Sequence, residues 1–238
     1  MKKIFLYSTA FMLLFSSCKT DDTSEAYVEP ENIETQNAYD DEAIQKFLSD
    51  NYLDNLGNIK SYSSTTTADD NYPSLATLPK TKLNSGVIYI AREGAQPTPG
   101  TAIGSTDIIR FMNRTYTYVA VNTDNNVNFT STALFRSTID GAGVPEVDPS
   151  YYYVKKSVLT ADTSKDRNYY EIEGLKEALQ NFKAFDMQDG DNYNLQGVII
   201  VPSRAAFARD AHYNYTGYSL RNRSFVFNFQ VYKTSVRP

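Results

Sequence analysis

Two stretches near the C-terminus carry apolar residues in patterns typical of β-strands. Residues 198–201 are four consecutive apolar residues, which indicates a strand buried on both faces, and Pro202 ends it because proline cannot donate to the next rung of a sheet. In residues 224–231 the phenylalanines Phe225, Phe227 and Phe229 share one parity. This period of two predicts a half-buried strand with a phenylalanine face. Between the two stretches lies a loop rich in aromatic residues.

The rest of the pattern predicts more strands and few helices. Strands are expected at 87–90, 107–112 and 115–121, with a turn or a bulge at Asn113-Arg114, and residues 127–130 lead into an irregular stretch. Residues 172–182 carry apolar side chains at helical spacing. The fold class that we expect is α+β: a mostly antiparallel sheet with one short helix packed across it.

The N-terminus has the organisation of an exported protein. A basic start and an apolar run of about a dozen residues predict a signal peptide over 1–17, since the run is too short to span a bilayer. Small residues directly before Cys18 resemble the lipobox of bacterial lipoproteins, so we expect Cys18 to be lipidated. The alternative is a secreted protein cut near Ser17 with a free thiol. Lys19 and the acidic residues after it resemble an export tag of surface lipoproteins.

The remaining segments divide the chain further. Residues 18–38 are acidic and polar, which predicts a tether. Residues 39–54 predict an amphipathic helix that packs on the domain or on a neighbouring helix through Ile44, Phe47 and Leu48. Its acidic residues from Asp40 onward would lie at the positive end of the helix dipole. Residues 55–82 are interpreted as a linker or extension, and 83–234 as the folded domain, with a long insertion at about 138–165.

Composition and charge argue against several kinds of partner and site. The net charge of -5, without a cluster of Lys and Arg, argues against nucleic acid as a partner. One cysteine and one histidine exclude a disulfide framework and a zinc site that needs several such ligands, and we expect neither a metal nor another cofactor. His212 is interpreted as a surface residue rather than a general base. Ser203 lacks the surroundings of a hydrolase nucleophile.

A series of short motifs in residues 83–234 resembles FKBP-type peptidyl-prolyl isomerases, and among them the lipoprotein members found in Bacteroidetes. Each motif is short, but their order along the chain matches. The motifs are Gly86-Val87-x-Tyr89, Gly94, Pro99-Gly100, Asp107-Ile108-Ile109-x-Phe111, Asn128-Phe129-Thr130, Ile172-x-Gly174-Leu175, Val201-Pro202-Ser203-x-x-x-Phe207 and Asn222-x-x-Phe225-Val226-Phe227.

The resemblance implies a curved antiparallel sheet wrapped around one short helix, with an aromatic pocket between them. In such a pocket the backbone N–H of Ile172 would hold the substrate carbonyl. An apolar pocket favours the twisted amide of an X-Pro bond, whose rotation barrier is about 18–20 kcal/mol. Carried over position by position, the catalytic residues would be Phe111, Phe129, Ile172, Phe207 and Phe227, and the binding residues Leu175, Thr130, Tyr218 and Leu220.

Three positions depart from the family pattern. Thr130 stands where the family usually has an aspartate, Phe207 where it usually has a tyrosine, and Leu175 where an aromatic pocket floor is common. These changes remove polar groups that orient a substrate. The insertion at 138–165 could also cover the pocket.

Two functions follow from the resemblance. One is a membrane-anchored prolyl isomerase and chaperone that acts on proline-containing polypeptides of exported or surface proteins. The other is a non-catalytic FKBP-like lipoprotein that serves as a binding subunit of an envelope secretion or gliding assembly. Both place the protein in the bacterial cell envelope, anchored through Cys18 to the outer membrane, with the periplasmic or surface face left open.

Overall fold

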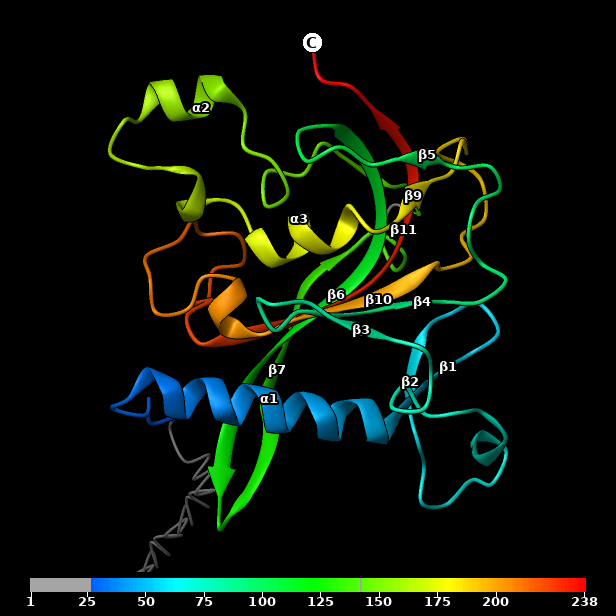
Figure 1. Ribbon diagram of the computed structural model, residues 1–238, viewed down its shortest axis with the longest axis vertical. Helices are drawn as coiled ribbons and strands as arrows, with labels where there is room; N and C mark the ends of the chain where they lie inside the picture. The colour runs from blue at the N-terminus through cyan, green and yellow to red at the C-terminus, as the bar shows by residue number, and fades with distance from the viewer. Residues whose placement is uncertain (1–26, 142) are drawn as a thin grey trace, which may run out of the picture.

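The computed structural model describes residues 27–141 and 143–238, which form a seven-stranded antiparallel sheet with helices on both faces (Figure 1). The strand order is β3-β4-β10-β11-β6-β7, and β8 pairs with β6. Its strands are β3 (Thr81–Lys82), β4 (Ile88–Ala91), β6 (Ile108–Thr123), β7 (Asn126–Ser137), β8 (Glu146–Val147), β10 (Gly197–Val201) and β11 (Arg223–Ser235). Two small sheets pair β1 (Asn51–Leu53) with β2 (Ile59–Ser61), and β5 (Thr101–Ala102) with β9 (Lys183–Ala184). The α+β class with antiparallel sheets and few helices is confirmed.

The two C-terminal strands lie at the centre of this sheet. β10 ends at Val201, directly before Pro202, and all five of its residues are buried. In β11 the face that carries Phe225, Phe227 and Phe229 is fully buried in the main core. The opposite face is buried as well, with Asn228 3% exposed, so the prediction of a half-buried strand is wrong. The reason is that the N-terminal region covers the second face.

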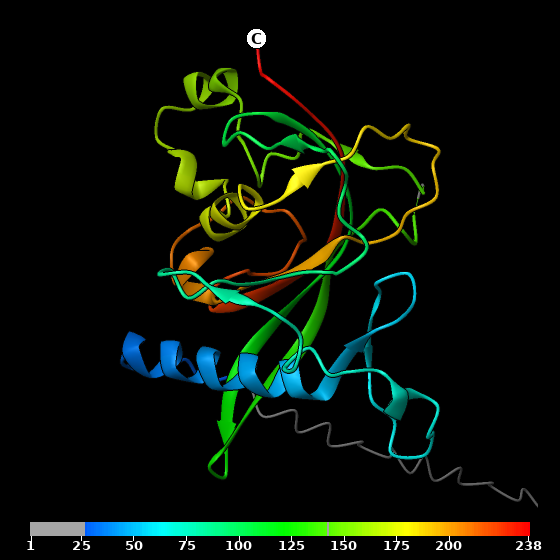
Figure 2. The ribbon, with the colours of Figure 1, turned by 45° about the vertical axis from the view of Figure 1, so that its right-hand side comes forward.

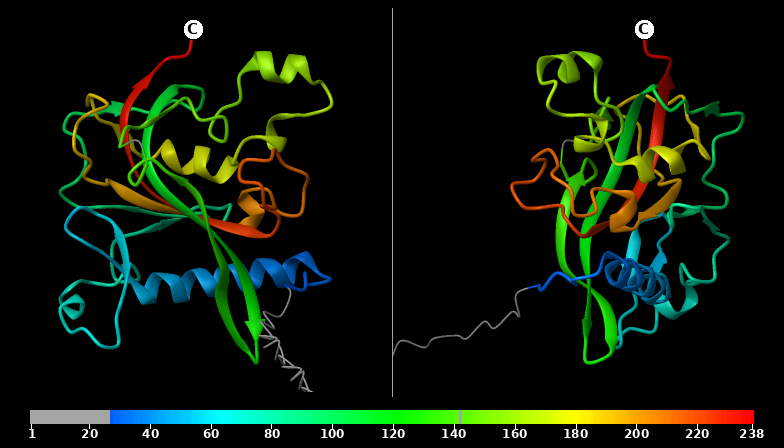
Figure 3. Two further views of the ribbon diagram at one scale, coloured as in Figure 1. Left: turned by 180° about the vertical axis from the view of Figure 1, so that it is seen from behind. Right: turned by 60° about the vertical axis from the view of Figure 1, so that its left-hand side comes forward.

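Helix α1 (Ile33–Asp50) provides this cover (Figures 1 and 3). The Asn32 side chain caps the first turn by accepting from the Glu34 N–H at 2.7 Å. Its inward stripe includes Ile44 and Leu48, which pack against Val198 and Val226 of the sheet. The predicted helix therefore exists, but it begins near residue 33 instead of 39, and residues 33–38 do not belong to a tether.

Residues 51–82 are part of the folded domain, which differs from the interpretation of 55–82 as a linker. Leu53 and Leu75 join the cluster beneath α1, and Leu75 is fully buried. The Tyr52 ring contacts those of Tyr62 and Tyr72, with centroid distances of 5.0 and 4.9 Å. This segment includes β1, β2 and a 3₁₀ turn at Asp69–Asn71. The segment is polar overall, and its few buried apolar side chains are enough to hold it against the domain.

Strands β6 and β7 form one long hairpin that projects past α1 (Figure 2). β6 continues through Asn113-Arg114, where the sequence suggested a turn or a bulge. The register with β7 shifts instead between Thr115 and Tyr116 and between Thr117 and Val119. On its even-numbered positions β6 presents Tyr116 and Tyr118 to the α1 side.

Helix α3 (Glu173–Leu179) packs on the other face of the sheet, and it is shorter than the predicted 172–182. Before it the chain forms α2 (Lys156–Ala161) and a 3₁₀ turn at Arg167–Tyr169, which lie within and after the predicted insertion. A third 3₁₀ turn, Ser203–Ala205, follows β10. Gly174 allows α3 to approach closely, since a Cβ there would lie 2.6 Å from Val201 Cγ1.

The signal peptide and Cys18 lie outside the described residues, as does most of the proposed tether. Within 27–141 and 143–238, no helix is both long enough and apolar enough to cross a membrane.

Candidate functional site

Most of the predicted pocket residues gather on the α3 face of the sheet. Phe111, Ile172, Leu175, Phe207, Leu220 and Phe227 are all buried in one cluster, each at most 2% exposed. Tyr218 is partly buried at the edge of this cluster. The sheet supplies Phe111 and Phe227, while α3 and the loops around it supply the others. Seven of the nine predicted pocket residues therefore lie in this cluster or against it.

Two predicted residues do not join them. Phe129 pairs with Ala120 across β6 and β7, and paired residues of an antiparallel ladder share a face. Because Ala120 faces α1, Phe129 does too, and its ring stacks on Tyr118 at 5.0 Å. Thr130 is exposed, and its hydroxyl donates to the Val119 carbonyl at 3.3 Å. Neither residue lies in the α3-side cluster.

Phe135 lies in the place that the sequence assigned to Phe129. The register shifts in the hairpin, together with a positive φ of 49° at Ser131, reverse the parity of β7 beyond that point. The Phe135 ring contacts Phe225 at 5.1 Å and Phe227 at 6.4 Å. No pattern of apolar residues marks these register shifts in the sequence, so the sequence did not predict that Phe135 faces the cluster.

The cluster is closed by a segment of the insertion, Pro149-Ser150-Tyr151-Tyr152-Tyr153-Val154, which we call the 149–154 segment. Tyr151 is 1% exposed, and its ring lies 6.5 Å from Phe227 and 5.1 Å from Phe135. Its hydroxyl donates to Glu146 Oε2 at 2.7 Å, and burial raises the pKa of this phenol well above its ordinary value. Tyr151 thus occupies the space over Phe227 where the resemblance implies an open pocket.

The backbone of the same segment also accepts the hydrogen bond that, by the resemblance, the Ile172 N–H would donate to the substrate. Ile172 is the N-cap residue of α3, and its N–H donates to the Tyr151 carbonyl at 2.8 Å. An N–H at a helix start has no partner inside the helix and must find one elsewhere. Here the partner comes from the chain itself.

Buried ion pairs hold the 149–154 segment in place. The Glu171 carboxylate, 1% exposed, accepts from the Val154 N–H at 2.8 Å through Oε1 and from Lys176 Nζ at 2.7 Å through Oε2. Arg167 bonds both this carboxylate and the Val154 carbonyl. The Tyr152 hydroxyl donates to the Gly104 carbonyl at 2.6 Å. With so many buried partners, the segment is a packed part of the core.

Twenty-one chains of solved structures match this chain, and FkpA is one of them. The crystal structure of FkpA from Escherichia coli is similar to the chain, with a TM-score of 0.38 and 17% sequence identity, over 67% of this chain and 53% of that chain. The chain therefore spans about half the length of FkpA. No family model matches the sequence, and no curated protein matches it.

The other polar candidates are engaged in the structure. His212 Nε2 accepts from the Leu220 N–H at 2.9 Å, which leaves Nδ1 to donate to the Tyr213 carbonyl at 2.9 Å. Ser203 is fully buried and bonds Asp40 of α1. Among residues 27–141 and 143–238, no group of three or more His, Cys, Asp and Glu side chains is placed to hold a metal ion.

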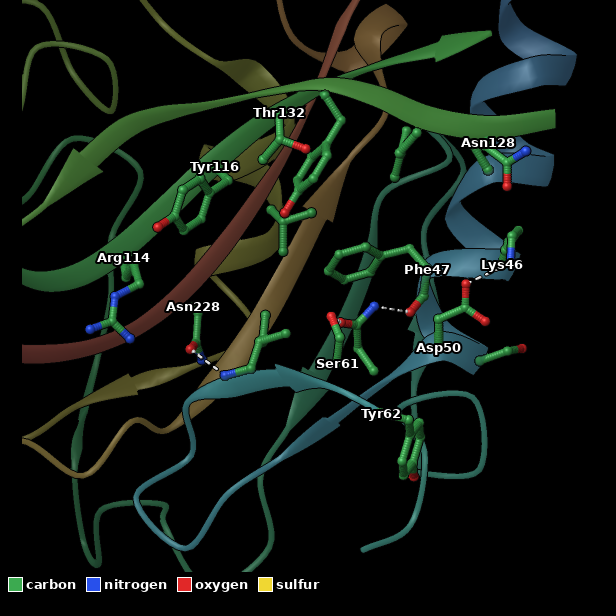
Figure 4. A pocket seen from close by; sticks show the side chains of 17 residues that line it. Lys46, Phe47, Asp50, Ser61, Tyr62, Arg114, Tyr116, Asn128, Thr132 and Asn228 are labelled. Carbon is green, nitrogen blue, oxygen red and sulfur yellow. Dashed lines mark hydrogen bonds and ion pairs between the residues drawn. The ribbon is translucent and has the colours of Figure 1, made fainter. Parts of the chain in front are cut away.

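An open cavity of about 650 Å³ lies on the opposite side of the sheet, between α1 and the strands β6, β7 and β11 (Figure 4). We call it the α1 cleft. Phe47, Tyr116, Tyr118, Phe129, Arg114 and Thr132 are among its lining residues. Phe129, which the sequence assigned to a pocket on the other face, thus lines a different hollow.

Proposed function

We propose that this chain is a non-catalytic FKBP-like protein of the cell envelope, which binds polypeptides without accelerating the isomerisation of their X-Pro bonds. This is the second of the two functions that follow from the sequence. The motif resemblance supports the FKBP-like part of the proposal. The closed α3-side cluster supports the absence of turnover.

One observation carries the proposal: the hydrogen bond from the Ile172 N–H to the Tyr151 carbonyl, at 2.8 Å. In an isomerase of the family the resemblance assigns this N–H to the substrate. A substrate would have to displace both the carbonyl and the buried Tyr151 ring. Removing a ring of this size from a core costs about 3–5 kcal/mol, which is too much for a weakly bound peptide to supply.

The same hydrogen bond also favours a second candidate, an isomerase that is closed in its resting state. By the resemblance, the Tyr151 carbonyl lies where the substrate carbonyl would lie, and six of the predicted residues belong to the same buried cluster as Tyr151. If the 149–154 segment were displaced, the N–H and the apolar walls would face the solvent. The segment would then act as an internal inhibitor.

A protease-coupled assay on an X-Pro peptide separates these functions. The protein is the full chain with Cys18→Ser, because residues before 83 belong to the core. Uncatalysed isomerisation takes about 10–100 s at 25 °C, and we expect micromolar protein to leave this rate unchanged. Tyr151→Ala, checked for folding by circular dichroism, is the variant that opens the cluster. Tyr213→Ala, at a residue that is 45% exposed, is its control.

The assay has three outcomes. No acceleration by either the wild type or Tyr151→Ala supports a binding protein. Acceleration by the wild type overturns the proposal in favour of an open isomerase. Acceleration by Tyr151→Ala alone, and not by Tyr213→Ala, overturns it in favour of the closed isomerase.

For location and partners, we propose attachment to the outer membrane through lipid on Cys18, with proline-containing polypeptides as clients. A subunit of an outer-membrane secretion assembly is the partner that the sequence resemblance suggests. These proposals rest on the lipobox-like residues before Cys18 and on the motifs of residues 83–234. They concern where the protein works, and they hold for either candidate activity.

A further inference from the structure

Residues 27–31, which precede α1 and lie outside any helix or strand, pack against the segment that follows β10. We call residues 27–31 the N-terminal arm. Arg209 Nη2 donates to the Pro30 carbonyl, and Nη1 donates to the Glu31 carbonyl at 3.3 Å. One guanidinium thus holds two successive carbonyls, which is recognition of a polypeptide backbone.

The carboxylate of Glu29 makes the part of the contact that depends on a side chain. Asn222 Nδ2 donates to Glu29 Oε2, and Arg221 Nη2 lies 3.7 Å from the same oxygen. Arg209 Nε lies 3.5 Å from Glu29 Oε1. Two arginines and one amide therefore converge on one carboxylate, and we call these three residues the carboxylate site.

The carboxylate site is built by the fold and not by the arm that it holds. The Asn222 N–H donates to the Ala208 carbonyl at 2.6 Å, which brings the residue before β11 next to Arg209. Asn222 is 2% exposed. Phe207 and Leu220, at the two ends of this segment, are buried in the α3-side cluster. The site would therefore keep its shape if the arm left it.

The arm is attached only at the surface of the domain. The Val28 side chain is 84% exposed, and no residue of the arm belongs to a hydrophobic cluster of the described chain. The Tyr27 hydroxyl adds one polar contact, to Gln36 Oε1 at 2.7 Å. Helix α1 has its own cap at Asn32 and its own buried contacts, such as those of Leu48. The arm can therefore leave without unfolding α1.

The arm also leaves polar groups of the site unsatisfied. Within the part of the chain that the structure describes, Arg209 Nε and Asn222 Oδ1 are buried and have no hydrogen bond. The ion pairs with Glu29 are partly open to solvent, since its side chain is 38% exposed, so water and salt weaken them. Such a contact can be exchanged for one with another segment that offers the same groups.

We propose that the carboxylate site binds an acidic, proline-containing segment of a partner polypeptide, and that the N-terminal arm occupies this site as an internal competitor. A polypeptide is the ligand that the structure supports, because the site already holds one through a carboxylate and through backbone carbonyls. The residue before a proline is restricted to extended conformations, and proline has no N–H that needs an acceptor. A Glu-Pro segment is therefore prepared for such a surface.

The test measures binding of the acetylated and amidated peptide Tyr-Val-Glu-Pro-Glu-Asn, the sequence of residues 27–32, to the full chain with Cys18→Ser. Glu29→Lys places a like charge beside both arginines and should release the arm. Isothermal titration calorimetry should show saturable binding of the peptide by this variant. The protein with Glu29 intact should bind at least about tenfold more weakly, because its own arm competes at a high effective concentration.

Glu31→Gln is the matched control, since only the backbone of this exposed residue contacts Arg209, and it should bind as the protein with an unchanged arm does. The peptide Tyr-Val-Gln-Pro-Gln-Asn should bind Glu29→Lys about tenfold more weakly or not at all. Adding Arg209→Gln to Glu29→Lys should weaken binding about tenfold or more, with folding checked by circular dichroism. Adding Arg221→Gln instead changes a side chain that is 50% exposed, so folding is kept, and should weaken binding about threefold.

The proposal is overturned if Glu29→Lys does not bind the peptide at millimolar concentration, or if it binds the glutamine peptide equally well. Undiminished binding after both arginine changes would overturn it too. Equal binding by the protein with Glu29 intact would show that the arm does not occupy the site, which contradicts the second part of the proposal. Binding of Glu29→Lys to phosphatidylglycerol vesicles in place of the peptide would overturn it in favour of a lipid headgroup.

This inference rests on the proposed role in binding polypeptides and names the chemistry of one bound segment. The X-Pro assay reads the α3-side cluster, whereas the peptide titration reads the carboxylate site. Failure of the peptide to bind would leave the absence of turnover unaffected, and measured turnover would leave the peptide titration unaffected.

Discussion

Asp40 is a buried carboxylate that joins α1 to the Pro202-Ser203 motif. It is fully buried, and its two oxygens accept from Ser203 and from Gln36 Nε2, the latter at 3.0 Å. Burial raises its pKa above the usual value, although the hydrogen bonds from Ser203 and Gln36 oppose this rise. The sequence placed Asp40 at the start of a helix. In the structure it lies in the second turn of a longer helix and faces inward.

We predict that Ser203→Ala destabilises the fold by about 1–3 kcal/mol at pH 7, because it leaves the buried carboxylate with fewer donors. The folded pKa of Asp40 is raised, so the stability that this group contributes is full below its unfolded pKa and is lost as the pH rises through the folded pKa. Losing the Ser203 hydroxyl raises that pKa further. The difference in free energy of unfolding between wild type and variant should therefore grow from acid to neutral pH.

Chemical denaturation of both proteins across this pH range measures the effect. Ser157→Ala, at an exposed position of α2, is the control and should stay within about 0.5 kcal/mol of the wild type. A Ser203→Ala difference that is the same at acid and neutral pH would show that the hydroxyl does not interact with a titrating Asp40.

At the scale of elements, the apolar patterns located the central strands and the two main helices. β10 and β11 could be predicted because a run of branched residues and a period of two are strong signals, and Ile44 and Leu48 marked α1. What the patterns missed is the burial of both sheet faces. It depends on α1 together with residues 51–82, whose few apolar anchors are distant in sequence from the strands that they cover.

The residues of the candidate site were likewise predicted only in part. Phe111 and Phe227 meet as predicted, because they lie on strands whose alternation the sequence shows, and Ile172 joins them at the start of α3. Phe129 does not, because the register shifts in the hairpin reverse the parity of β7 and bring Phe135 inward instead. The position of Tyr151 could not be read from the sequence either. It depends on a loop whose course is fixed by tertiary ion pairs, such as those of Glu171.

The integration of α1 gives an element-scale prediction. Leu48 is fully buried between α1 and the sheet, so Leu48→Ala should lower the free energy of unfolding by about 2–5 kcal/mol. Leu56→Ala is the matched control: this leucine is 48% exposed, and the change should cost about 0.5 kcal/mol or less. Urea denaturation followed by circular dichroism measures both. Equal, small effects would mean that α1 is only loosely attached to the domain.

At the scale of the whole molecule, one face of the sheet is filled by the chain itself and the other carries an open cleft. On the α3 face, the 149–154 segment fills the space above Phe227, and the polar groups there are paired within the chain. On the α1 face, donors and aromatic rings remain open to solvent in the α1 cleft. The α3-side cluster is thus filled, whereas the α1 cleft behind the same sheet is open, and this difference agrees with the proposed binding role.

The net charge of the molecule bears on how it would reach a membrane. The chain carries 23 Lys and Arg against 28 Asp and Glu, for a net charge of -5, so electrostatic attraction to anionic lipids would not hold it there. Lipid on Cys18 would, because each buried CH₂ contributes about 0.8 kcal/mol and several acyl chains together anchor stably.

We therefore predict that the full chain, expressed in a Gram-negative host, fractionates with the membranes and incorporates a labelled fatty acid. Cys18→Ser should abolish the label, since no acyl chain can then be attached. Ser17→Ala keeps a small residue before the cysteine, so it should behave as the wild type does. If Cys18→Ser stays with the membranes after a high-salt wash, an attachment other than the lipid holds the protein there.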